Sequence, residues 1–225
     1  VFIRKSSEDI HIFEVIFFRN LLACLIIIPL MYSPGLASFK MHRPRLFVWR
    51  AVFVSLGMFA GFSALTLIPL AQATAISFTA PIFVTILASF VFGEAIKFRR
   101  ITAILVGFIG MLIIVQPGTG AISIGMILAF TGAFFHSINL IIVKKLTINE
   151  TANAIVVWMV IMLVPISFIP AIFVWEWPSA LTWFYLWGLA ICGTVGHSFF
   201  TRAYSLAEIT SLQPLQFIKL PMIAF

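Results

Sequence analysis

Long apolar stretches follow one another along almost the whole chain of 225 residues, with short polar segments between them. A helix needs about 20 mostly apolar residues to cross a membrane, and eight stretches come near or above this length. They are residues 12–32, 46–67, 71–92, 101–116, 122–143, 154–175, 182–204 and 207–225. None alternates with the period of a barrel strand, so the pattern predicts an all-α polytopic membrane protein.

The composition supports this prediction and excludes other classes. Hydrophobic residues make up 62% of the chain and charged residues only 9%, whereas a soluble domain carries about 25% charged residues. A soluble globular domain, a disordered chain and a nucleic-acid-binding module are therefore excluded. Cys24 and Cys192 lie inside apolar runs and are interpreted as small hydrophobic residues. We expect no metal or cofactor. The sequence contains no phosphate-binding loop motif, so we do not expect direct use of ATP.

The distribution of Lys and Arg predicts the orientation, because basic residues favour cytoplasmic loops. Ten basic residues fall on one side of the predicted bundle: Lys40, Arg43, Arg45, Arg50, Lys97, Arg99, Arg100, Lys144, Lys145 and Arg202. Only Arg4 and Lys5 fall on the other side. The first side is therefore predicted to be cytoplasmic. The chain starts at Val1 and stops at Phe225 inside an apolar run, so we expect a piece of a longer protein.

A short motif occurs twice and suggests an internal repeat. Leu70-Ala71-Gln72-Ala73-Thr74 matches Leu206-Ala207-Glu208-Ile209-Thr210 at a displacement of 136 residues. At both places a glycine-bearing span meets a very short turn and then a proline-bearing span. The charge distribution puts the first turn outside and the second inside, so the two copies would run in opposite directions. Inverted repeats of this kind are typical of transporters.

Several motifs make the sequence similar to the drug/metabolite transporter superfamily, in particular to its EamA-type carriers. They are Phe17-Phe18-Arg19-Asn20, the span 71–92 closing on Gly93-Glu94, Arg99-Arg100-Ile101, Gly107-Phe108-Ile109-Gly110 and Gln116-Pro117-Gly118. The resemblance implies two inverted five-helix repeats, ten helices when intact, of which about eight are present here. Residues 1–117 would form the first repeat without its first helix, and residues 118–225 the second without its last. Ala203-Tyr204 and Pro214-Leu215-Gln216-Phe217 make it similar to carriers for S-adenosylmethionine or riboflavin.

Three ionisable residues fall inside predicted spans, where a charge costs roughly 2.5–3.5 kcal/mol at the bilayer centre. Glu14 is near the outer end of its span and can reach water. Arg19 is about two turns in, and it either binds a carboxylate or phosphate or holds helices together. Lys219 either faces a cavity or pairs with a carboxylate in a helix beyond residue 225.

Polar stripes mark the candidate binding surfaces. Thr74, Ser77, Pro81 and Thr85 share one helix face by their spacing, and Gln213 follows the repeated motif. His136 and Asn139 share a face with Gly132, and His136 either handles protons or substrate or is a packed, hydrogen-bonded histidine. The alternative role for all of these polar residues is ordinary packing between helices. The predicted substrate-binding residues are Arg19, Thr74, Ser77, Pro81, His136, Asn139, Gln213, Gln216 and Lys219.

These features favour a secondary carrier that moves a small polar metabolite across a bacterial inner membrane by alternating access. Arg19 and Lys219 favour a substrate with a carboxylate or another acidic group. A multidrug-type exporter of the same superfamily is the alternative. A channel would need a continuous polar pore, and no predicted span shows one. An intramembrane enzyme would have to rely on Gly196-His197-Ser198, where the adjacent His197 lies on a different helix face from Ser198. The expected partners are the lipid bilayer and the small-molecule substrate, with no nucleic acid; a homodimer is left open.

Overall fold

The structure is a computed structural model that describes residues 2–31, 41–93, 98, 101–102, 104–106, 108–109 and 123–213. These residues form helices joined by turns and loops, with no strand among them. The helices are α1 (Phe2–Ser6), α2 (Ile12–Met31), α3 (Pro44–Leu67), α4 (Leu70–Ser77), α5 (Ala80–Phe92), α7 (Ile124–Leu146), α8 (Ala152–Ile172), α9 (Ala180–Leu206) and α10 (Ile209–Leu212). An all-α polytopic fold is thereby confirmed.

Local sequence explains where these helices begin. Pro44 occupies the first turn of α3, where its missing N–H costs nothing. The side chains of Ser123, Thr151 and Ser179 accept hydrogen bonds from backbone N–H groups in the first turns of α7, α8 and α9. Four segments are long and apolar enough to cross a membrane: α3, the α4–α5 segment, α7 and α8. Helices α2 and α9, with 20 and 27 residues, coincide with two further predicted spans.

Two predicted spans lie largely or partly outside the described residues. Of the span 101–116, the structure describes only the seven residues 101–102, 104–106 and 108–109. Of the span 207–225, it describes the part up to Gln213. The prediction of eight spans is therefore tested for six of them, and each of the six is helical.

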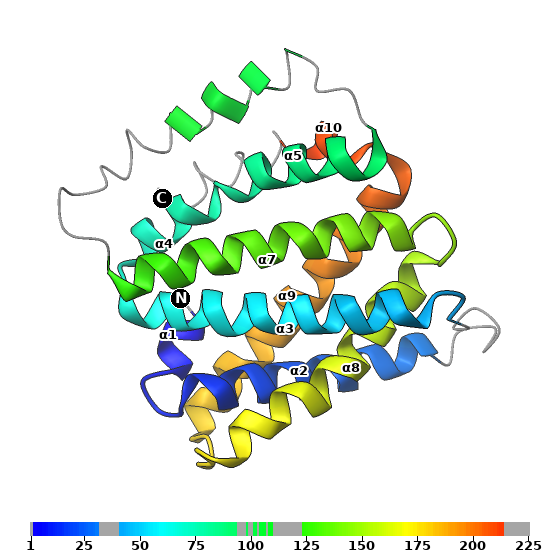
Figure 1. The fold of residues 1–225 in the computed structure, drawn as a ribbon. Coiled ribbons are helices and arrows are strands. Elements are labelled where there is room, and N and C mark those ends of the chain that lie inside the picture. Colours follow the sequence, from blue (N-terminus) through cyan, green and yellow to red (C-terminus); the bar gives the residue numbers. More distant parts are fainter. Residues whose placement is uncertain are drawn as a thin grey trace.

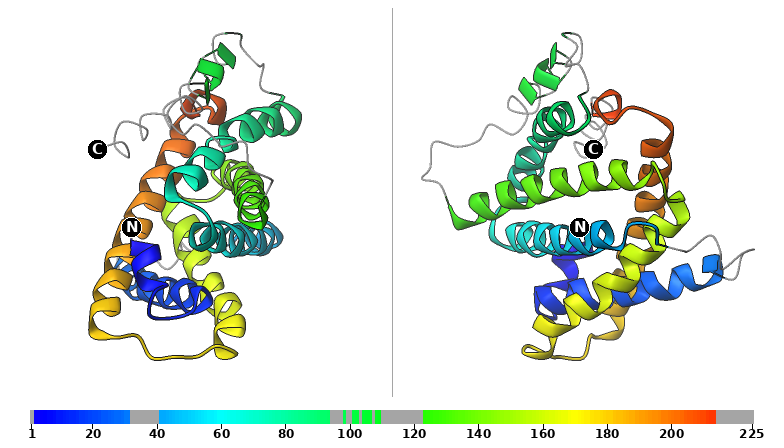
Figure 2. Two further views of the ribbon diagram at one scale, coloured as in Figure 1. Left: turned by 90° about the vertical axis from the view of Figure 1, so that its left-hand side faces the viewer. Right: turned by 45° about the vertical axis from the view of Figure 1, so that its right-hand side comes forward.

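The helices stack as a layered bundle with one helix crossing behind it. Figure 1 shows α5, α7 and α3 running side by side, with α2 and α8 packed together below them. In Figure 2, α9 runs along one side of this stack, and it contacts α1, α2 and α8 there. The most extensive contact joins α3 and α7, and the next joins α2 and α8. Residues from the two predicted halves of the chain are thus in intimate contact throughout the bundle.

The third span is not one helix but two. Helix α4 ends at Ser77, the residues Phe78 and Thr79 form a turn, and α5 begins at Ala80 with Pro81 in its first turn. Proline has no N–H to continue the ladder, and the Thr79 hydroxyl donates to the Ile76 carbonyl at 2.7 Å. The helix face predicted for Thr74, Ser77, Pro81 and Thr85 is therefore interrupted by this turn, with Thr74 and Ser77 in α4 and Pro81 and Thr85 in α5.

Two basic side chains satisfy the carbonyl groups at the ends of α3 and α9. The Arg4 guanidinium donates to the Leu65 and Ile68 carbonyl oxygens at 3.1 and 3.0 Å. The Lys144 ammonium donates to the Tyr204 and Ala207 carbonyl oxygens at 2.9 and 2.6 Å. The last carbonyls of a helix lack intrahelical partners and carry partial negative charge, so a cation is the favoured partner at this position.

Two carboxylates hold the opposite ends of the same helices. Asp9 accepts hydrogen bonds from the Ser179 N–H at 2.9 Å and the Thr182 hydroxyl at 2.7 Å, at the start of α9. Glu150 accepts from the His42 and Arg43 N–H groups at 2.7 and 3.2 Å, at the start of α3. The loop before α2 therefore holds the N-terminus of α9, and the loop before α8 holds the N-terminus of α3.

The helix ends correct the register proposed for the internal repeat. Helix α3 ends at Leu67 and α4 begins at Leu70, while α9 ends at Leu206 and α10 begins at Ile209. These boundaries correspond at a displacement of 139 residues, so the displacement of 136 taken from the short motif is wrong by three positions. The inverted relation of the two halves stays a prediction, as do the boundaries 1–117 and 118–225.

The contact between α3 and α7 depends on a glycine that faces another glycine. A Cβ added at Gly132 would lie 3.0 Å from both the Cα and the N of Gly61. A Cβ added at Gly61 would meet nothing within 4 Å, because it would point into open space. Small residues let helix backbones approach closely in membrane bundles, and of these two facing glycines it is Gly132, not Gly61, on which the close approach depends.

We predict that Gly132→Ala destabilises the protein and that Gly61→Ala does not. The added methyl at position 132 forces two backbones apart, and overpacking typically costs about 1–3 kcal/mol. The measurement is the unfolding transition of the detergent-purified protein, with Gly61→Ala as the matched control on the facing helix. Equal transitions for the two variants would contradict this account of the α3–α7 contact.

Candidate functional site

A cavity of about 500 Å³ lies in the middle of the bundle. Its lining comes from α2, α3, α4, α5, α7 and α9, so segments from one end of the chain to the other contribute to it. Most of the lining is apolar or glycine. The polar side chains of the lining are Arg19, Thr74, Ser77, His136, Asn139 and His197. No Asp or Glu is among the described residues that line it.

The cavity brings together five of the nine residues predicted to bind substrate: Arg19, Thr74, Ser77, His136 and Asn139. Pro81 is buried at the start of α5 and does not line the cavity. Gln213 is fully buried beyond α10, and its amide nitrogen donates to the Ile209 carbonyl. Gln216 and Lys219 lie outside the described residues.

Arg19 is buried, with 4% of its surface exposed. One terminal nitrogen donates to the Asn20 side-chain oxygen at 2.7 Å, and the Asn20 amide in turn donates to the Ser167 hydroxyl at 3.2 Å. The rest of the guanidinium lies over Gly193 of α9, where an added Cβ would be 2.5 Å from Nη2. Within the described residues Arg19 has no carboxylate within ion-pair distance.

The hydroxyl groups of α4 are partly committed to their own helix. Thr74 donates to the Leu70 carbonyl at 2.7 Å, and Ser77 donates to the Thr74 carbonyl at 2.6 Å. Each hydroxyl oxygen keeps lone pairs that can accept a hydrogen bond. At the cavity these two residues therefore offer acceptors, whereas Arg19 offers only donors.

Sequence analysis missed two residues of this region. Arg50 was counted among the ten basic residues of the cytoplasmic side, just inside its helix, but it is 1% exposed and donates to the Asn139 side-chain oxygen at 3.2 Å. His197 was considered only beside Ser198. It lines the cavity from α9, one turn after Gly193, and this i to i+4 spacing was the signal that could have placed it there.

The Gly196-His197-Ser198 segment does not form a catalytic unit. Ser198 donates to the Thr194 carbonyl at 2.9 Å and lines a separate groove with Arg202, away from the cavity that His197 lines. Among the described residues, no three His, Cys, Asp or Glu side chains are grouped as metal ligands. This segment therefore supplies no nucleophile–base pair to the central cavity.

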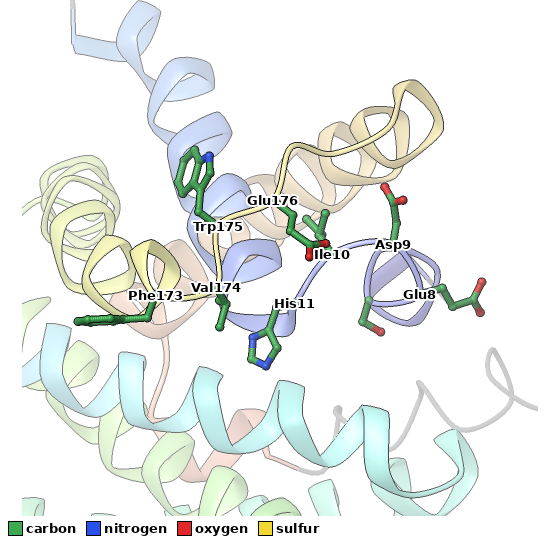
Figure 3. Close-up of a pocket in the computed structure, with 9 residues that line it drawn as sticks. Glu8, Asp9, Ile10, His11, Phe173, Val174, Trp175 and Glu176 are labelled. Carbon is green, nitrogen blue, oxygen red and sulfur yellow. The ribbon is translucent and has the colours of Figure 1, made fainter.

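A second pocket, of about 540 Å³, opens at the surface on the predicted outer side. Figure 3 shows its two walls, residues 7–11 before α2 and residues 173–176 after α8. Glu14, near the start of α2, joins these walls beneath the surface: its carboxylate accepts from the His11 N–H at 3.0 Å and from the Glu176 N–H. Glu14 is completely buried and does not reach water, so its role here is to hold the two loops together.

Comparison with known proteins agrees with a bundle of apolar helices around a central cavity, the architecture of a multi-pass membrane carrier. The model of the EamA-like transporter family matches residues 1–116. The chain belongs to the EamA-like transporter family. A solved crystal structure with 18% sequence identity has the same fold, with a TM-score of 0.75 over 96% of this chain and 77% of that one.

Curated relatives carry transporter names. The S-adenosylmethionine uptake transporter of Rickettsia prowazekii (strain Madrid E) is 28% identical over 94% of this chain and 72% of its own length. The riboflavin transporter of Rhizobium johnstonii is 32% identical over 89% and 67%. The pseudopaline exporter of Pseudomonas aeruginosa (strain UCBPP-PA14) is 28% identical over 96% and 76%. The chain is therefore a multi-pass membrane transporter of small molecules, not an enzyme.

Asp9, on the side of the bundle predicted to be outer, gives a prediction about pH. The hydrogen bonds from the Ser179 N–H and from the Thr182 and Ser179 side chains favour its charged form and lower its pKa below the ordinary 3.8. Its support of the α9 N-terminus is therefore complete above the ordinary pKa and is lost as pH falls through the lowered value.

We expect Asp9→Asn to raise hydrogen exchange in the first turn of α9 several-fold at neutral pH. The difference from wild type should vanish in acid, when Asp9 of the wild type is itself protonated. Glu8→Gln is the control, because Glu8 is exposed and pairs only with Lys5 at 3.4 Å. A difference that persists unchanged at the lowest pH would contradict the role given to the Asp9 charge.

Proposed function

We propose that the protein is a secondary carrier of the inner membrane that binds a small polar metabolite in the central cavity and moves it by alternating access. The observation that carries this proposal is the 500 Å³ cavity between six helices, with the buried Arg19 in its wall. A charge inside a membrane bundle is costly unless it has a partner or a function. Because no described carboxylate pairs with Arg19, an acidic group on the substrate is the partner that we propose.

The matched contacts at the helix ends support an inverted repeat. Arg4 and Lys144 each hold the C-terminal end of a helix, and the positions of cation and carbonyls differ by 139 or 140 residues between the two sets. Asp9 and Glu150 hold the N-terminal ends of the same two helices. Two equivalent halves of opposite direction can exchange conformations, which opens the shared cavity first to one side and then to the other.

Uptake of S-adenosylmethionine or of riboflavin is the leading candidate activity, because relatives of this chain carry both names. Multidrug-type export is the alternative, since one relative is named an exporter and most of the cavity wall is apolar. Apolar walls with a few oriented polar groups are common in sites for organic molecules.

Counterflow in proteoliposomes is the experiment that tests the proposed function. Vesicles carrying the full-length protein and loaded with unlabelled S-adenosylmethionine or riboflavin should accumulate the same labelled compound transiently and saturably. Protein-free vesicles and Arg19→Gln vesicles are the controls. Flux without counterflow would indicate a channel, and the absence of exchange for every compound tested with folded protein would contradict the proposal.

The glycine under Arg19 gives a sharper prediction. A methyl group at position 193 would collide with the guanidinium, whose flexible end can move away without unfolding the bundle. Gly193→Ala should therefore weaken the apparent affinity for the exchanged substrate by roughly tenfold or more, the value of one charge-assisted hydrogen bond. Gly196→Ala, whose added Cβ would meet nothing within 4 Å, is the control on the same helix. If both variants transport alike, Arg19 is not a substrate ligand.

A further inference from the structure

Arg50 is the largest fully buried side chain among the described residues. It lies in the second turn of α3 and makes three contacts with other helices. Its Nε donates to the Asn139 side-chain oxygen at 3.2 Å, one terminal nitrogen donates to the Ile155 carbonyl, and the other lies 3.1 Å from the Met159 sulfur. Arg50 thus joins α3 to α7 and α8 behind the wall of the cavity.

No carboxylate compensates this charge within the described part of the chain. A buried arginine without an ion-pair partner is an expensive way to hold three helices together, and a neutral side chain could form contacts of the same kind. What the arginine provides here is a group that donates and can never accept a hydrogen bond. This property matters for the residue that it contacts at the cavity, Asn139.

The contact determines which way the Asn139 amide is turned. Because Arg50 only donates, the atom facing it must be the amide oxygen, so the amide nitrogen points the other way. Asn139 lines the cavity, and no described residue accepts a hydrogen bond from its amide nitrogen. The arrangement therefore leaves two N–H donors of Asn139 available on the cavity side.

Arg19 reaches the same cavity from α2 and also presents only donors. The two residues come from different helices, and no described carboxylate lines the wall between them. We infer that Arg50 is a positioning residue that holds the Asn139 amide as a donor, and that the cavity therefore takes an anionic ligand whose carboxylate or similar acceptor groups bind Arg19 and Asn139. This inference rests on the proposed function and specifies the substrate class.

Asn139→Asp keeps the contact with Arg50 and changes only the groups that position 139 offers to a ligand. The aspartate has the same size and still accepts the bond from Arg50, so the helix contact remains. It replaces the two cavity-side donors with a carboxylate oxygen, which repels an anion. Arg50→Lys keeps the positive charge but cannot form the planar set of three contacts, and Asn139→Leu removes the amide altogether.

The experiment measures binding of probes matched except for the carboxylate to the full-length, detergent-purified protein by thermal stabilisation. One pair is S-adenosylmethionine and decarboxylated S-adenosylmethionine, and the other is succinate and succinamide. In wild type, the acid member of at least one pair should bind at least tenfold more tightly than its partner without a carboxylate. In folded Asn139→Asp this preference should disappear.

A double-mutant cycle tests the positioning role of Arg50. Arg50→Lys should weaken binding of the acid probe at least fivefold when Asn139 is present and less than twofold in the Asn139→Leu background. An equal effect in both backgrounds would mean that Arg50 acts through the fold alone and would overturn the positioning role. If Arg50→Lys does not fold, an unchanged acid preference in folded Asn139→Asp is sufficient to overturn the inference.

The outcomes distinguish this inference from the proposed function. Riboflavin counterflow by a protein that shows no acid preference with either pair would overturn the inference and leave the carrier function standing. Acid-selective binding without counterflow of any compound would support the inference and contradict the carrier function. Absence of both binding and exchange, with folded protein, would contradict both.

Discussion

The interior of a membrane bundle contains no bulk water, so each buried polar group must find its partner within the protein. This constraint explains most of the specific contacts in the structure. Arg4 and Lys144 satisfy the carbonyl groups where α3 and α9 end, and Glu14 satisfies N–H groups where two loops meet. Arg19 and Arg50 bond to neutral amide and carbonyl groups, and within the described residues neither pairs with a carboxylate. The positive character of the cavity follows from this distribution.

Most of the fold could be predicted from the sequence, because the apolar stretches are as long as a membrane is thick. The break after Ser77 was not predicted: a proline inside an apolar run is compatible with a kinked helix as well as with two helices, as the prolines at 165 and 170 in continuous α8 demonstrate. The register of the repeat was off by three because a five-residue motif has few identities, whereas the helix ends correspond without ambiguity.

The candidate site was predictable only where a polar residue interrupts an apolar stretch. Arg19, His136 and Asn139 gave that signal, and all three line the cavity. The signal from Arg50 was misleading, since a basic residue six positions after the start of a helix is easily assigned to the membrane surface. Its position follows from tertiary packing against α7 and α8, which local patterns do not encode. Gln213 stays a prediction: its amide nitrogen donates to the Ile209 carbonyl, and the residues that follow it lie outside the described part of the chain.

Two glycines show how the same residue type serves helix packing in one place and, in the role proposed for Arg19, substrate recognition in another. Gly132 lets the backbones of α3 and α7 touch, so it defines the width of the bundle, while Gly193 makes room for the end of a flexible side chain. The second arrangement positions a cation without a rigid partner, and the guanidinium can move a short distance when the helices around it move. A carrier needs this combination, because its site must bind in one conformation and release in the other. In the role proposed for it, Arg19 is suited to this exchange, because it is seated over a glycine and bonded to a neutral amide.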